Sequence, residues 1–123
     1  MKTVTAGAAI VAAAALGIAA RGDAPFVAST NRSFAELMAD AMHRMHEGMA
    51  APPTGNPDED FVIQMVPHHQ GAIDMAEALL VHGKDPELRQ LAKGIIAEQQ
   101  NEIQIMRSWQ RRHRPPPTKG NDR

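Results

Sequence analysis

The stretch FVIQMVPHHQGAIDMA, residues 61–76, decides the fold class of this chain. At about 100° per residue, its apolar side chains and one histidine fall on one side of a helix. That stripe consists of Phe61, Met65, His68, Ala72, Met75 and Leu79. We therefore predict a helix over residues 59–81, with this stripe buried in a core. Pro67 lies inside the helix and should bend it or leave a carbonyl free.

The ends of this helix are marked by residues that favour helix termini. Asp58 or Asp60 is the expected N-cap, because a short acidic side chain accepts hydrogen bonds from free backbone amides. Gly83 follows the last apolar residue and suits the left-handed conformation past a helix end. The sequence thus predicts a turn directly after the second helix.

Two further helices are predicted on either side of it. Ser33 and Glu36 have the spacing of a capping box, which opens a helix that runs to about residue 50, where a Pro- and Gly-rich segment over 51–57 breaks it. Asp85 and Pro86 are a cap followed by proline at the first helical position, and that helix runs to about residue 112.

Short connections place successive helices side by side and antiparallel. The predicted fold is therefore all-α, a short antiparallel up-down-up bundle over residues 34–113, with no strand. Residues 25–33 are an extended linker, and the Pro-rich residues 114–123 are expected to be a disordered tail.

Residues 1–24 have the pattern of a signal peptide. Lys2 precedes an Ala-rich apolar run over residues 4–20, and small residues fit a cut after Ala20 or after Ala24. The run also approaches the about 17–25 residues that a spanning helix needs, so an uncleaved N-terminal anchor is the alternative. We expect a periplasmic or secreted protein, attached to a membrane only if the leader stays uncleaved.

Composition excludes several classes of function. Thirteen basic and fourteen acidic residues give a formal net charge of −1, so the chain lacks the basic field that binds nucleic acid. It contains no cysteine, which excludes disulfides and thiolate metal sites. Any soft metal ligand must therefore be one of its eight methionines or six histidines.

Methionines form a narrow arc on the first helix: Met38, Met42, Met45 and Met49, with His46 on the flank. Methionine fills irregular gaps in cores, which is the structural interpretation of this arc. Leucine would specify a core better, so the choice of thioethers indicates that sulfur itself is needed.

The paired histidines of the second helix are the next candidates. His68 and His69 point about 100° apart, so they serve either one site or two, and Met65 lies one turn before them. On the third helix Glu102 lies in an apolar stripe with Met106, and Glu98 lies at its edge. Burial of Glu102 without a partner would be costly, which predicts a histidine ring N–H or a metal beside it, unless local twist turns it to solvent.

Equal rise along antiparallel helices predicts which residues share a level. Counted from the turn at Gly83, the two histidines should lie level with residues 97–99, and Met65 with residue 101 or 102. Counted from the 52–57 loop, they should lie level with residues 40–44, which include Met42. The candidate ligands are thus predicted to converge on one layer.

Two blocks of sequence resemble the DUF305 family of exported bacterial proteins. The first comprises Asp58, Phe61, Met65, Pro67-His68-His69-Gln70 and Ala72-Ile73-Asp74-Met75-Ala76, and the second Ile95-Ile96, Gln99, Glu102-Ile103, Met106 and Trp109. The resemblance implies a ferritin-like helical fold, an exported location and, as in one cyanobacterial member, copper binding through Met and His. It implies His68, His69, Met65 and Met75 as the positions that transfer best.

Thioether and imidazole donors suit Cu(I), and also Ag(I). We therefore expect copper sequestration or delivery without catalysis. The expected metal ligands are His68, His69, Met65, Met75, Met42, Met45, His46, Met38, Met49 and Met106, supported by Glu102, Glu98 and Asp74. A metal-free interaction module or homodimer is the alternative. A di-iron oxidase is disfavoured, because no Glu in the chain has His three residues later.

Overall fold

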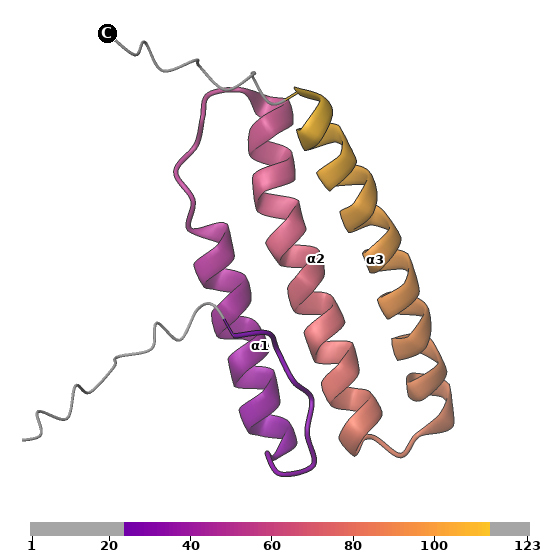
Figure 1. Cartoon of the computed structure of the whole chain (residues 1–123). Coiled ribbons are helices and arrows are strands. Elements are labelled where there is room, and N and C mark those ends of the chain that lie inside the picture. The colour runs from indigo at the N-terminus through magenta and orange to yellow at the C-terminus, as the bar shows by residue number, and fades with distance from the viewer. Residues whose placement is uncertain (1–23, 114–123) are drawn as a thin grey trace, which may run out of the picture.

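The computed structural model describes residues 24–113, which contain three α-helices and no strand. These are α1 (Phe34–Met49), α2 (Pro57–His82) and α3 (Pro86–His113). Figure 1 shows them side by side, each antiparallel to the next. The all-α, up-down-up bundle predicted from the sequence is confirmed.

The helices form a single layer with α2 in the middle. Helix α2 packs against both α1 and α3, whereas within the described residues α1 and α3 do not contact one another. The layer is therefore one helix thick, and each of its two faces includes a side of all three helices.

The predicted starts of α1 and α3 are confirmed by their hydrogen bonds. The Ser33 hydroxyl accepts from the Glu36 amide at 3.2 Å, and the Glu36 carboxylate accepts from the Ser33 amide at 2.7 Å. The Asp85 carboxylate accepts from the amide of Leu88 at 2.9 Å. Both caps satisfy amides that the first turn of a helix leaves free.

The start of α2 differs from the prediction, because Asn56 is its cap. The Asn56 side chain accepts from the Asp58 amide at 3.1 Å, and Pro57 occupies the first turn, where a missing N–H costs nothing. Asp60 instead turns back to the loop and accepts from the Thr54 amide at 2.6 Å. The helix begins earlier than expected because an amide side chain capped it in place of a carboxylate.

Gly83 ends α2 for a different reason from the predicted one. Its φ of −71° and ψ of 146° are extended, not left-handed. A β-carbon at this position would lie 2.6 Å from Leu79 Cδ1 and 2.7 Å from the Leu79 carbonyl oxygen. Close approach to the last turn of the helix therefore favours glycine here.

The pairing of α1 with α2 is also shifted from the prediction. The Gln64 side chain donates to the Met49 carbonyl at 3.0 Å, so the end of α1 lies level with the second turn of α2. The connection over residues 50–56 continues past the end of α1 in the same direction, alongside the first turns of α2, before the chain enters α2 (Figure 1). The prediction assumed a tight turn, so it placed the two histidines level with Met42 rather than with the last turn of α1.

Small side chains allow α1 and α2 to approach closely. A β-carbon on Gly48 would lie 2.5 Å from the Pro67 Cβ, and one on Gly71 would lie 2.8 Å from the Met45 Cβ. Helix α2 continues through Pro67 without a break. Proline and glycine thus form the contact surface between the two helices.

The stripe predicted to be buried on α2 lies instead on one face of the layer. Phe61 is 60% exposed and His68 is exposed. The buried residues lie toward the two neighbouring helices: Val62, His69, Gly71, Ile73, Asp74, Ala76 and Ala78. A central helix is buried on two flanks, so the periodicity of a single apolar stripe did not reveal which sides face its neighbours.

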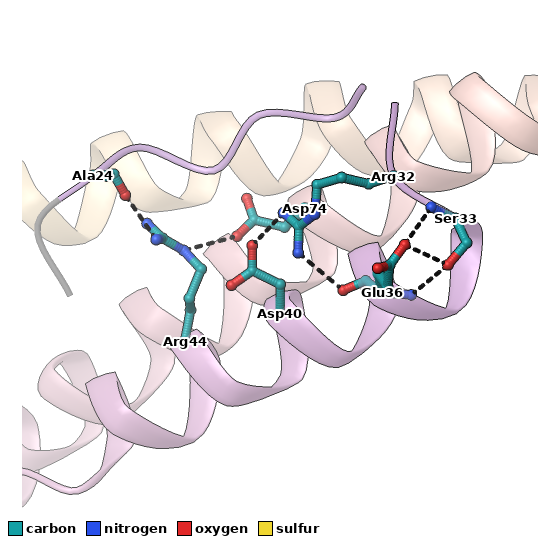
Figure 2. Close-up of polar contacts among 7 residues, drawn as sticks. All are labelled: Ala24, Arg32, Ser33, Glu36, Asp40, Arg44 and Asp74. Atoms are coloured by element: carbon teal, nitrogen blue, oxygen red, sulfur yellow. Dashed lines mark hydrogen bonds and ion pairs between the residues drawn. The ribbon is translucent and has the colours of Figure 1, made fainter. Parts of the chain in front are cut away.

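The opposite face of the layer carries the N-terminal segment, residues 24–33. Figure 2 shows Arg44 on α1 reaching the Ala24 carbonyl, at 2.7 Å, while Arg32 of the segment pairs with Asp40 at 2.8 Å. The His82 ring lies 2.8 Å from the Arg32 carbonyl oxygen. We call this side the covered face and the other, which carries the Phe61 and His68 stripe, the open face.

Candidate metal centre

The pair His69 and Glu102 joins α2 to α3. His69 Nε2 lies 2.5 Å from a Glu102 carboxylate oxygen, and the His69 side chain is 8% exposed against 45% for Glu102. Glu102 thus has the predicted histidine partner, although its side chain is half exposed and not buried as the prediction assumed.

This contact lies about one turn from the predicted level, which was residues 97–99. Side chains lean toward the N-terminus of their own helix, and the N-termini of antiparallel helices lie at opposite ends. His69 and Glu102 therefore lean toward one another and meet although their backbones are not level. The equal-rise prediction counted backbone levels alone.

The second nitrogen of His69 has no partner. Nδ1 is buried and makes no hydrogen bond to any described residue. A buried N–H without an acceptor costs about 1–3 kcal/mol, so the proton belongs on Nε2, where it is donated to Glu102. Nδ1 then carries a lone pair, so it is the ring atom that could bind a metal ion, while the carboxylate holds the far side of the ring.

Two methionines, Met65 and Met106, lie one helical turn along the interface from His69 and Glu102. Met65 is four residues before His69, and Met106 is four residues after Glu102, so both lie in the same direction along the antiparallel pair. Met106 is 9% exposed and belongs to the buried cluster against which Met65 packs. The interface between α2 and α3 therefore combines one imidazole nitrogen with two thioethers close by.

His68 does not join this group. It is exposed on the open face, although its ring makes an edge contact with that of His69 at 5.9 Å between centroids. The prediction that both histidines face inward is wrong for His68, because the flank of α2 that packs against α3 lies on the His69 side. The two rings point to different surroundings, as their 100° separation allowed.

The candidates on α1 are not gathered at His69. Met42 is 38% exposed and His46 is exposed, whereas Met45 packs on Gly71 between α1 and α2. Met38 and Met75 line an apolar groove on the open face, and Met49 ends α1. The single layer of ligands predicted from the register does not form.

Asp74 and Glu98 also lie away from His69. Glu98 is exposed. Asp74 is 2% exposed and faces α1. Its carboxylate accepts a hydrogen bond from Gln70 of α2 at 2.9 Å, and Arg44 of α1 lies 3.9 Å away. Burial raises the pKa of the Asp74 carboxyl, against the opposing effects of Gln70 and Arg44.

Sequence reasoning missed the ion pair between Arg44 and Asp74 and the packing of the N-terminal segment. A signal existed in the spacing of Asp40 and Arg44, four residues apart on the side of α1 away from the methionines. The partners in residues 24–33 follow no helical period, so the sequence pattern could not place them.

Residues 24–113 contain neither a carboxylate and histidine metal cluster nor a membrane-spanning helix. No group of three or more His, Cys, Asp or Glu side chains in this part is arranged to hold a metal ion. None of its helices has the length and hydropathy of a membrane span.

Comparison with known proteins bears on the whole of α2 and α3. The family model described as "Domain of unknown function (DUF305)" matches residues 58–122. A protein of Acanthamoeba polyphaga mimivirus, described as "Uncharacterized protein L153", is 45% identical over 51 residues, which are 42% of this chain and 34% of that protein. The chain thus matches about a third of that relative's length. The family match, together with the helical hairpin that carries His69 and Glu102, shows that this chain belongs to the DUF305 family.

Proposed function

We propose that this protein is an exported copper-binding protein that sequesters or delivers Cu(I). The observation that carries the proposal is the His69 ring, whose Nε2 is occupied by Glu102 and whose Nδ1 is buried without a partner. Metal-bound histidines commonly donate their other N–H to a carboxylate in this way.

The neighbouring donors favour a soft ion. Met65 and Met106 supply thioethers one helical turn from His69 and Glu102 in the same interface, and thioether with imidazole is a donor set that suits Cu(I) and Ag(I) better than a hard ion. Copper is the cargo in this proposal and no turnover is involved. Glu102 holds the ring in the tautomer that leaves Nδ1 free to bind.

The chain's composition fits the compartment in which such a protein would work. The leader predicted over residues 1–24 would deliver it to the periplasm or the outside, and the chain has no cysteine that an oxidising environment could convert. Met38 and Met75, which line the open-face groove, are further soft donors for additional ions.

Titration with Cu(I) against a competing chelator tests the proposal. We expect stoichiometric binding by the wild type and a loss of affinity of about 100-fold or more in His69→Ala, because a first ligand and its held geometry are both removed. Met65→Leu and Met106→Leu should each weaken binding with little effect on folding, since Leu is close to Met in volume.

His43→Ala is the matched control. His43 is exposed on α1, where it pairs with Glu47, and its loss should leave Cu(I) affinity unchanged. Far-UV circular dichroism of each variant confirms that the helices are intact. Absence of stoichiometric Cu(I) binding by the wild type, or equal affinity in His69→Ala, contradicts the proposal and leaves a metal-free helical interaction module as the function.

A further inference from the structure

The open face carries an apolar groove to which all three helices contribute. The groove encloses about 320 Å³, and each of the ten residues that line it is apolar. Phe34 and Met38 come from α1, Met75 and Leu79 from α2, and Leu88 and Leu91 from α3. The hollow is therefore a continuous apolar strip across the layer.

Large side chains on this face are exposed to an unusual extent. Phe34 is 40% exposed, Leu88 49% and Leu91 58%, and Phe61 on α2 is 60% exposed. Single exposed apolar residues are ordinary, and Phe61 is separated from the groove by exposed His68, but the contiguous apolar patch formed by the groove residues marks an interaction site.

The two faces of the layer are unequal in what covers them. Residues 24–33 lie across the covered face and are held by Arg44, Asp40 and His82 (Figure 2). Within residues 24–113, nothing comparable lies over the groove of the open face. Helical domains normally bury such a face against a second layer of structure.

The size of the open face matches that of a stable interface. Helices of 26 and 28 residues are about 40 Å long, and two neighbouring helices at 8–10 Å spacing span about 20 Å. Helices α2 and α3 alone thus offer about 800 Å², which is what each partner contributes to an interface of standard size.

We propose that a second copy of this chain covers the open face and that the protein is a homodimer of two three-helix layers. A two-fold contact brings the same patch of both subunits together, so the patch must tolerate its own image. The groove meets that condition, because none of the ten residues that line it is charged. This inference does not depend on metal binding.

Residues 1–23 are the competing occupant, because they include an apolar run. The chain enters the described structure at Ala24, whose carbonyl is held by Arg44 on the covered face. A segment leading from there to the groove would have to pass around the edge of α1. The entry point therefore favours a second copy as the cover.

Sedimentation velocity of the full chain over a range of concentrations tests the dimer. We expect a wild-type dimer and an increase of about 30-fold or more in the dimer dissociation constant for Leu91→Glu, which puts a charge into the apolar groove. Leu91 is 58% exposed, so the subunit itself should still fold, as thermal melting by circular dichroism will show.

Val27→Glu is the matched control, because Val27 is 61% exposed but lies in the N-terminal segment on the covered face. It should leave the dimer intact. A wild type that remains monomeric up to near-millimolar concentration overturns the proposal, as does equal dissociation by both variants. A monomeric full chain whose version starting at Ala24 dimerises would assign the groove to residues 1–23 and also overturn it.

Discussion

The two ring nitrogens of His69 lie in different environments. This difference is what His69 contributes to the candidate site. Nε2 contacts a half-exposed carboxylate, and Nδ1 is buried without a hydrogen-bond partner among the described residues. The ring is thereby fixed in orientation and in tautomer before any ion arrives. A preorganised donor binds more tightly than a mobile one, because less freedom is lost on binding.

Glu102→Gln tests the role of that carboxylate. Glutamine retains the shape and one acceptor oxygen but loses the charge, so Cu(I) affinity should fall by about 10- to 100-fold, as it does when partners of metal-bound histidines are changed. Competition with a Cu(I) chelator measures the change. Glu98→Gln, one turn earlier on α3 and exposed, is the control and should bind as the wild type does. Equal effects of the two changes would assign no such role to Glu102.

Asp74 gives a second prediction at the residue scale, concerning pH. Burial raises its pKa above the ordinary value of 3.8, while Gln70 and Arg44 oppose this and Asp40 adds to it. The folded chain then binds this proton more tightly than the unfolded chain, so Asp74 lowers stability as pH rises from about 3.8 through the raised pKa. The free energy of unfolding of Asp74→Asn, measured in urea, should therefore improve relative to wild type over that window.

A variant with the opposite expected pH dependence is the control for Asp74→Asn. The hydrogen bonds from Ser33 lower the pKa of the Glu36 carboxyl from 4.5, so its stabilisation is present above that value and disappears as pH falls through the lowered pKa. Glu36→Gln should thus lose stability relative to wild type as pH rises, opposite to Asp74→Asn. Parallel curves for Asp74→Asn and wild type would contradict the effect of burial.

At the scale of the elements, two glycines inside helices allow the effect of close packing on stability to be measured separately from the effect of helix propensity. A β-carbon on Gly71 of α2 would lie 2.8 Å from the Met45 Cβ, whereas one on Gly94 of α3 would have no neighbour within 4 Å among the described residues. Gly94→Ala should stabilise the protein by about 0.5–1 kcal/mol, through helix propensity alone. Gly71→Ala should be less stable than Gly94→Ala by about 1–3 kcal/mol, the usual cost of overpacking.

Urea unfolding followed by circular dichroism measures both variants. If Gly71→Ala is stabilised as much as Gly94→Ala, α1 can move away from α2 at little cost and the close approach is not a constraint. Cu(I) affinity should be unaffected by either change, since both glycines lie away from the interface that holds His69 and Glu102.

The elements also explain which predictions from sequence succeeded. Caps and proline positions are local, so the helices and most of their ends followed from residues such as Ser33 and Asp85. Which residues of two helices lie level with one another depends on the path of the loop that connects them. Residues 50–56 continue past the end of α1 beside the first turns of α2. For that reason the partnership of Glu102 with a histidine was predicted correctly, while the partnership of Met42 with the histidines was not.

At the scale of the whole molecule, the order of the helices in the layer determines which side chains of α2 are buried. A strong stripe on α2 predicts one buried side, but a middle helix in a single layer is buried on two flanks. His68 and Phe61 therefore lie on the open face, and His69 lies between helices. Three-dimensional packing determines which helix lies in the middle. The residue periodicity within one helix carries no information about that order.

The single layer also separates α1 from the part of the chain that the family model matches. Of the two other helices, α1 contacts only α2, and the family match begins at residue 58, after α1 has ended. Changes in α1 are therefore constrained by one interface and leave the hairpin of α2 and α3 with its own contacts. A chain cut before residue 50 would therefore keep every contact between α2 and α3, including the one that holds His69 beside Glu102.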